Sequence, residues 1–315
     1  MYRLAHLTDL HLAPLPGFRK RDLLSRRFLG WLSWQRRRHR VHRKEVLDAL
    51  VVDVHRMKPD HVVVTGDLVN LALPVEFVQA GLWLEALGGP DWVTAVPGNH
   101  DAYVALPWVG AWSHIGPWMR GDEAKAAASD AVGDFPFVRR RGPVTLIGLS
   151  SAVSNTPTFA QGRLGTAQLG QLRAMLEKLG GDGSCRVILL HHPPVDDMTS
   201  GRRRLLDSQQ LRDVLAATGA ELVLCGHNHV FQFREIMGPD GPIPVFAAPS
   251  ASLAADHRGR YGGWQLYSIE QVDGRWDVAV EVRRFDAAVD GFRRELHGRV
   301  TATAGSPRLV LRPAA

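Results

Sequence analysis

The stretch WVTAVPGNHD, residues 92–101, decides the fold, because an apolar run of strand length ends there directly in a polar cluster. Six apolar runs of the chain end in this way. Five of the polar ends carry side chains that can bind a metal: Asp9-Leu10-His11, Gly66-Asp67, Gly98-Asn99-His100-Asp101, His191-His192 and Gly226-His227-Asn228-His229. The sixth run, Val144 to Leu149, ends in Ser150-Ser151.

The segments between these runs have helical patterns. Apolar residues within 46–54 follow helical spacing, and a second helix is expected from Pro74 to Gly88-Gly89. Two more are expected over Thr166–Leu179 and Ser208–Thr218, each with a hydroxyl residue at its N-cap. The alternation predicts an α/β protein. In an open α/β sheet the carboxyl ends of the strands line one crevice, so the polar ends should meet there. Carboxylate, amide and imidazole groups bind first-row metals without any thiolate.

The order of the five motifs resembles that of the calcineurin-like metallophosphoesterases. The versions at 98–101 and 226–229 are similar to those of the class III cyclic nucleotide phosphodiesterase branch. The resemblance covers roughly residues 1 to 270, and five motifs in one order are far more specific than any one of them. It implies an α/β fold built as a four-layered α/β/β/α sandwich. Since the first and last motifs lie at residues 9 and 229, a single domain over 1–315 is expected.

The resemblance also implies a dinuclear metal site. The implied ligands are Asp9, His11 and His229 for one metal, Asn99, His191 and His227 for the other, and Asp67 as the bridge. The bridge should be a carboxylate, because no other side chain in the set has two equivalent anionic oxygens. Two ions about 3.5 to 4 Å apart can share a hydroxide, which would be the nucleophile. This ligand set accepts Mn, Fe or Zn.

Further residues are candidates for roles around the metals. His100 matches the family residue that assists the leaving oxygen. In part of the family a carboxylate three residues after the bridging Asp orients this histidine; here Asn70 stands in that place and could still accept the histidine N–H. His192 is interpreted as a wall or supporting residue, although the strand boundary leaves open that it replaces His191 as the ligand. Arg203 belongs to the run Arg202-Arg203-Arg204, for which a solvated charge run is favoured, with contact to a substrate phosphate as the alternative. His192, Arg203 and Asn70 are thus the candidate substrate contacts.

A basic segment over 18–44 lies outside the regular pattern. It holds eleven Lys or Arg and one Asp, a charge of +10 against +6 for the whole chain. Its apolar residues fall on one helical face: Leu24, Phe28, Trp31 and Leu32. This pattern favours a helical lid that also contacts an anionic membrane. A simple lid whose arginines reach phosphate ranks second, and a nucleic-acid patch ranks last, because the aromatic residues are not interleaved with the basic ones.

The remaining segments are interpreted more simply. Residues 102–134, with Trp108, Trp112 and Trp118, are expected to form a Trp-rich cap, most simply by packing of the three tryptophans. Residues 264–285 predict a β-hairpin with an Asp-Gly turn. No element is expected beyond Ala287, and residues 301–315 are expected to be poorly ordered.

Composition sets limits on location. The hydrophobic share of 45% and the charged share of 22% are those of a globular protein. The first residues predict a strand that leads into a ligand and not a signal peptide, and no apolar stretch reaches the ~20 residues of a membrane span. A cytoplasmic protein is expected, with peripheral contact at the inner membrane surface through 18–44. The two cysteines are expected to be reduced core thiols.

The function expected from these observations is phosphoester hydrolysis by two metal ions, with a phosphodiester favoured over a monoester. The substrate would be a small-molecule or lipid-linked phosphoester. One alternative is a membrane-associated pyrophosphatase acting on a lipid-linked phosphate such as UDP-diacylglucosamine. An alternative of another class is a non-catalytic protein-binding scaffold. Loss of ligands would identify a scaffold, and here every ligand position is present.

Overall fold

The computed structural model describes residues 1–15, 17–19, 22, 27–123, 135–154, 158–255, 259–301 and 308–313. Two sheets form its centre. The first has the order β13-β12-β11-β10-β1-β2-β3, and the second has the order β4-β5-β6-β7-β9-β8. The strands of the first sheet are β1 Tyr2–Leu7, β2 His61–Thr65, β3 Val93–Val96, β10 Gly263–Val272, β11 Arg275–Asp286, β12 Gly291–Thr301 and β13 Arg308–Pro313. Those of the second are β4 Phe137–Arg141, β5 Val144–Gly148, β6 Cys185–Leu189, β7 Leu222–Cys225, β8 Gln232–Gly238 and β9 Gly241–Ala247.

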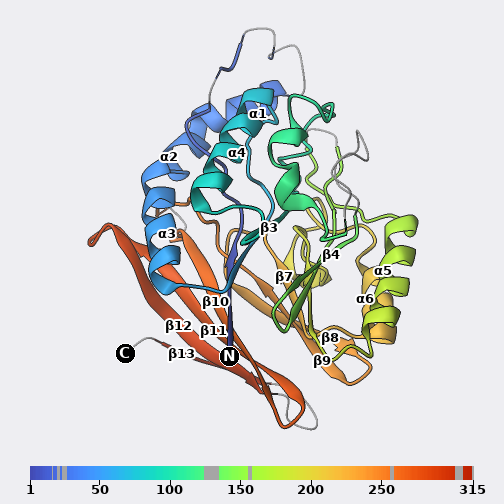
Figure 1. Cartoon of the computed structure of the whole chain (residues 1–315). Helices are drawn as coiled ribbons and strands as arrows, with labels where there is room; N and C mark the ends of the chain where they lie inside the picture. Colours follow the sequence, from blue (N-terminus) through green and yellow to red (C-terminus); the bar gives the residue numbers. More distant parts are fainter. Residues whose placement is uncertain are drawn as a thin grey trace.

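Helices cover the outer faces of both sheets (Figure 1). Helices α3 (Lys44–Met57) and α4 (Pro74–Leu87) share an apolar core with the first sheet, and α5 (Thr166–Leu179) and α6 (Ser208–Thr218) share one with the second. A third core lies between the sheets and joins residues such as Leu4 and Val187. The predicted four-layered α/β/β/α sandwich is therefore confirmed.

The parallel strands are those whose ends carry the polar motifs. β1, β2 and β3 run parallel to one another, and so do β5, β6 and β7. Their apolar residues are almost completely buried on both faces, as expected of strands packed between two layers. All five candidate metal-binding motifs therefore emerge at the carboxyl edges of the two sheets.

The helix predictions were accurate in extent but not in capping. Helices α5 and α6 have the predicted bounds, and α4 begins at Pro74. The predicted hydroxyl N-caps are wrong, because Thr166 and Ser208 are the first helical residues and the caps are Gly165 and Asp207. The carboxylate of Asp207 accepts the backbone N–H of Gly165 and so links the starts of the two helices.

The C-terminal part contains more sheet than the sequence predicted. The hairpin is confirmed as β10 and β11, with Asp273 and Gly274 both at positive φ, as a two-residue turn requires. The prediction of no element beyond Ala287 is wrong, because β12 pairs antiparallel with β11 and β13 with β12. Strand β12 lacks clean apolar alternation, and its neighbours supply the backbone pairing. Residues 302–307 and 314–315 of the predicted disordered tail lie outside the described residues.

The basic segment forms α1 (Arg27–Ser33), a π-helical turn η2 (Trp34–Arg38) and a short α2 (His39–Val41), while Leu24 lies outside the described residues. Its C-terminal end is bound to the loop after β9, because His42 forms an isolated bridge with Leu253. The Trp-rich segment includes the 3₁₀ turns η3 (Trp112–His114), where Trp112 packs on Phe77 of α4, and η4 (Gly116–Met119). No helix within the described ranges is long and apolar enough to cross a membrane.

Candidate metal centre

The candidate ligands lie on loops whose backbone is held in an uncommon conformation. Nine non-glycine residues of the described chain have positive φ, and five of them are predicted ligands. These five are Asp9, His11, Asp67, His227 and His229. A left-handed backbone is costly for non-glycine residues and concentrates at functional sites. Each of the five follows closely after β1, β2 or β7, so the sharp turn aims its side chain across the strand ends.

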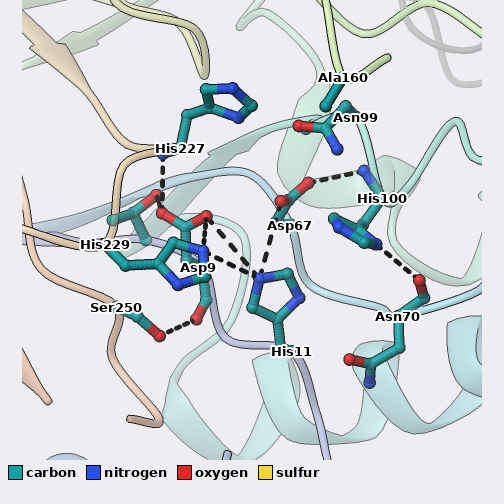
Figure 2. Close-up of polar contacts among 12 residues, drawn as sticks. Asp9, His11, Asp67, Asn70, Asn99, His100, Ala160, His227, His229 and Ser250 are labelled. Atoms are coloured by element: carbon teal, nitrogen blue, oxygen red, sulfur yellow. Dashed lines mark hydrogen bonds and ion pairs between the residues drawn. The ribbon is translucent and has the colours of Figure 1, made fainter. Parts of the chain in front are cut away.

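The first group of side chains consists of Asp9, His11 and His229. The Nε2 atom of His229 lies 3.1 Å from Oδ1 of Asp9 and 3.3 Å from Nε2 of His11. The backbone of Asp9 is fixed by a hydrogen bond that its carbonyl accepts from Ser250 (Figure 2). The three side chains thus converge as the sequence predicted, although they come from opposite ends of the chain.

The second group consists of Asn99, His191 and His227. The Nε2 atom of His191 lies 3.2 Å from Oδ1 of Asn99 and 3.2 Å from Nδ1 of His227. The other ring nitrogen of His191 donates to the backbone carbonyl of Thr65 at 2.7 Å. That bond leaves the lone pair of Nε2 directed at the group, which is the tautomer a metal ligand requires.

Asp67 lies between the two groups. Its Oδ2 atom is 3.3 Å from Nε2 of His191 and 3.7 Å from Nε2 of His11. Its Oδ1 atom accepts the backbone N–H of His100 at 2.7 Å. Ring nitrogens and carboxylate oxygens gather in three overlapping sets, two of which contain Asp67. One carboxylate therefore faces both groups.

Two buried donor atoms in this cluster fit a metal site. Nε2 of His227 has no hydrogen-bond partner among the described residues, and Oδ1 of Asp9 faces the ring nitrogens of His229 and His11. Buried polar atoms without partners are rare in folded proteins and costly in free energy. Both belong to predicted ligands, and both can give a lone pair to a cation. The oxygen and imidazole donors of the cluster suit first-row metals.

Electrostatics favours an anionic carboxylate in the centre. Burial raises the pKa of Asp67, but the facing His191 and His100 outweigh burial and hold that pKa far below its ordinary value. Burial lowers the pKa of His191, yet the attraction of Asp67 raises it to about 9. The pKa of His227 is well below its ordinary value because of burial and the neighbouring His192.

The two adjacent histidines of the β6 motif have different surroundings. His191 faces Asp67 and Asn99, as described above. His192 uses both ring nitrogens elsewhere, since Nδ1 lies 2.8 Å from Oγ of Ser151 and Nε2 lies 3.2 Å from the carbonyl of Ala160. Ser151 belongs to the sixth predicted strand end, so that end supports the site without supplying a ligand.

His100 is oriented by the backbone of Asn70. Its Nδ1 atom donates to the Asn70 carbonyl at 2.6 Å, whereas the Asn70 side chain donates to the carbonyl of Leu12. Asn70 thus accepts the histidine N–H, as the sequence allowed, but through its backbone carbonyl and not through its side chain. Burial, together with Arg38, lowers the pKa of His100 to about 4.

Three residues near the metals were missed by the sequence analysis. Asp101 accepts three backbone N–H bonds from the ligand loops, and its place directly after His100 was the available signal. His42 is buried, with its ring edge-on to that of His11 and 4.6 Å away between centroids. Arg38 contacts His11 and His100. Nothing in a run of basic residues distinguishes the one that turns inward.

A cavity of about 310 Å³ opens above this cluster. Its floor includes Asn99, His100, Arg38 and Arg203, and Tyr103 contributes from the segment 102–134. Arg203 also donates to the backbone carbonyl of His227. The cavity therefore brings one candidate metal ligand, Asn99, together with His100 and two guanidinium groups.

Comparison with known proteins agrees with this arrangement. Residues 2–231 match the sequence model of a family described as calcineurin-like phosphoesterase. A Synechococcus protein named as a probable cyclic nucleotide phosphodiesterase is 26% identical over 234 residues, which cover 72% of this chain and 78% of that protein. The glycerophosphodiester phosphodiesterase GpdQ of Enterobacter lignolyticus is 26% identical over 209 residues, 62% of this chain and 66% of that protein.

Solved structures show the same fold. A dimetal phosphatase from Danio rerio superposes with a TM-score of 0.58 at 13% identity, over 90% of this chain and 95% of that one. A purple acid phosphatase from yellow lupin superposes with a TM-score of 0.55 at 12% identity, over 90% of this chain and 51% of that one.

Proposed function

The chain belongs to the calcineurin-like phosphoesterase family and is a metal-dependent phosphoester hydrolase, and from this premise we propose that it cleaves a small phosphodiester. The observation that carries the proposal is the position of Asp67, whose Oδ2 atom lies 3.3 Å from Nε2 of His191 and 3.7 Å from Nε2 of His11. Two metal ions bound there would supply Lewis acidity toward water and toward the phosphoryl oxygens. We propose Mn, Fe or Zn, because imidazole and carboxylate donors are mixed in the cluster.

The seven predicted ligands keep their proposed roles. Asp9, His11 and His229 would hold one ion, and Asn99, His191 and His227 the other. The contact between Oδ1 of Asp9 and Nε2 of His229 supports the first set, and the unpartnered buried Nε2 of His227 among the described residues supports the second. His192 is proposed as a support for the loop after β6, because both of its ring nitrogens are already engaged.

His100 is proposed as the residue that assists the leaving oxygen. Its ring lies on the cavity floor, and its Nδ1–H is held by the Asn70 carbonyl. With a pKa of about 4 the ring is neutral at pH 7, so it needs an adjacent anion to become protonated. A substrate phosphate in the cavity would be that anion. Arg203, on the same floor, is proposed to contact the substrate.

A diester is favoured because both curated relatives described above carry phosphodiesterase names, one for cyclic nucleotides and one for glycerophosphodiesters. No observation on the described residues favours a pyrophosphate of a lipid-linked nucleotide. A scaffold without catalysis is likewise not supported, because all seven ligand positions converge.

The exchange Asp67→Asn tests the metal-site assignment. Replacing the shared carboxylate by a neutral amide should remove metal from both positions and lower the turnover of bis(p-nitrophenyl) phosphate by roughly 100-fold or more. Elemental analysis and initial rates measure the two effects. Asp48→Asn makes the same chemical change at an exposed position of α3 and should behave as wild type. Two metals per chain and near wild-type turnover in Asp67→Asn would refute the assignment.

We also propose that the segment 18–44 contacts anionic membranes. Phe28 and Leu29 are 43% and 46% exposed, and Arg36 and Arg40 are exposed beside them. Each basic side chain near an anionic surface contributes about 1 kcal/mol, weakened by salt. A protein held in this way would lie on the cytoplasmic surface of the inner membrane. The wild type should sediment with phosphatidylserine vesicles at low salt, and the double variant Arg36→Gln, Arg40→Gln should not. Equal sedimentation of both proteins would contradict the proposal.

A further inference from the structure

The guanidinium of Arg38 enters the candidate metal centre, whereas Arg36 and Arg40 of the same segment are exposed. One amino group of Arg38 lies 2.8 Å from Nδ1 and 3.0 Å from Nε2 of His11. The other lies 3.1 Å from Nε2 of His100. Arg38 thus bridges a predicted metal ligand and the predicted leaving-group residue. Arg38 and His100 both line the cavity described above.

The π-helical turn η2 accounts for this orientation. It spans Trp34–Arg38, begins at a buried Trp34 and ends at Arg38. A π-turn inserts an extra residue per turn, which rotates the following side chains, and such turns are rare and frequently lie at functional sites. Arg36 and Arg40 on either side remain exposed. The local geometry therefore selects one arginine of the basic run and directs it inward.

The electrostatic surroundings of Arg38 leave its charge incompletely matched. Asp67 and Asp9 attract it, but no carboxylate of the described residues lies within ion-pair distance of its guanidinium. Its present hydrogen-bond acceptors are imidazole nitrogens. A histidine that gives its lone pair to a metal cannot also accept from Arg38, so several guanidinium donors are available to an anion. A planar guanidinium matches two oxygens of a phosphate.

We propose that Arg38 binds the phosphate group of the substrate, which makes the segment 18–44 part of the substrate site. This inference rests on the proposed function, because it takes the reacting group to be a phosphoester above the two ligand groups. The phosphate would lie between Arg38 and Arg203 on the cavity floor.

The test compares Arg38→Gln with Arg38→Lys in the metal-loaded protein. The glutamine variant removes the positive charge and the paired N–H donors of the guanidinium. The dissociation constant of inorganic phosphate should therefore rise about tenfold or more. KM for bis(p-nitrophenyl) phosphate should rise in parallel. The lysine variant keeps the positive charge but lacks the paired guanidinium donors. Its affinity for phosphate should therefore lie between those of the wild type and Arg38→Gln. Metal content should stay at the wild-type value in both variants.

Arg36→Gln is the matched control, because it removes the same charge two residues away at an exposed position of the same turn. It should bind phosphate within about twofold of wild type. Phosphate binding is measured by calorimetry and does not depend on turnover, so a lack of diesterase activity in the wild type would reject the proposed function while leaving Arg38 testable. An unchanged phosphate affinity in Arg38→Gln, or a loss of metal from it, would overturn the proposal.

Discussion

Asp101 is the residue that ties two ligand loops to each other. Its buried carboxylate accepts the backbone N–H groups of Asp67 at 2.9 Å, Val69 at 3.0 Å and Gly98 at 2.8 Å. These donors belong to the loops after β2 and β3, which carry the bridging carboxylate and Asn99. Burial, followed by repulsion from Asp67, raises the pKa of Asp101 to about 7. Asp101 therefore positions ligands without facing the metals itself.

Asp101→Asn should loosen both loops. An amide has one accepting oxygen, and its NH₂ group would face a backbone N–H, so unfolding free energy should fall by roughly 1–3 kcal/mol. Metal affinity should fall about tenfold, because the spacing of Asp67 and Asn99 is no longer fixed. Urea titration and metal titration measure the two losses. Asp91→Asn, at an exposed site before β3, is the control. Unchanged metal affinity would show that the loops hold their positions without Asp101.

At the scale of residues, the sequence identifies the candidate metal ligands better than the residues that hold those ligands in place. The ligands could be found because each follows an apolar strand directly. His42, which lies against His11, and Arg38 could not be found, because their partners come from segments that only the tertiary fold brings together. Asn70 was correctly considered as the acceptor for His100, but the use of its backbone carbonyl could not be foreseen, since a backbone carbonyl leaves no signal in the side-chain sequence.

At the scale of elements, glycines permit the ligand loops to approach one another. A Cβ atom on Gly226 would lie 1.9 Å from Oγ1 and 2.9 Å from Cβ of Thr8, and rotation of the Thr8 side chain would not move its Cβ away. One on Gly98 would lie 2.3 Å from Oδ1 of Asp67. The strand end before each ligand is thus packed directly on the neighbouring ligand.

Gly226→Ala should therefore disturb the metal centre from the loop after β7. We expect a loss of roughly 1–3 kcal/mol in unfolding free energy and a matching loss of metal at the first group. Gly170→Ala is the matched control, because Gly170 lies inside α5 with open space around its Cβ position. The unfolding free energy of the Gly170→Ala variant should rise by about 0.5–1 kcal/mol, because alanine is favoured over glycine inside a helix. If both variants have the same stability and metal content, close packing at Gly226 is not required.

The elements that could be predicted are those with local signals. Helix α5 has helical apolar spacing, and the β10–β11 hairpin has an Asp-Gly turn at its tip. Strand β12 was missed because its pairing partner β11, and not its own pattern, determines its structure. The inward turn at Arg38 was missed because a π-turn has no sequence signature.

For the whole molecule, buried histidines outside the metal centre make stability depend on pH. His61 begins β2, is fully buried, and has Nε2 2.7 Å from Oγ1 of Thr94. Burial, with smaller contributions from Arg141 and Arg139, lowers its pKa to about 3. The unfolded chain binds a proton at His61 below pH ~6.5, whereas the folded chain does not until about pH 3. Stability should therefore fall as pH decreases through that window.

His61→Gln should flatten this dependence. Within the window, each unit by which the pH falls should lower the unfolding free energy of the wild type by up to about 1.4 kcal/mol through His61. The variant should lack this contribution to the slope. Urea unfolding at pH 4.5, 5.5 and 7.5, chosen as roughly spanning the window, gives the two slopes. Chelator is added to both proteins so that metal release does not contribute. Parallel slopes for wild type and variant would show that His61 does not titrate in this way.

The left-handed backbone at five predicted ligands implies that substitutions which raise the cellular abundance of the protein would lower its hydrolytic activity. These positions hold a conformation that glycine and asparagine adopt at lower cost. In a library of variants selected only for cellular abundance, they should tolerate or even favour such replacements. Selection for hydrolysis should restore aspartate and histidine at every one of them. The centre of this enzyme would then appear as a set of sites where the two selections disagree in sign: Asp9, His11, Asp67, His227 and His229.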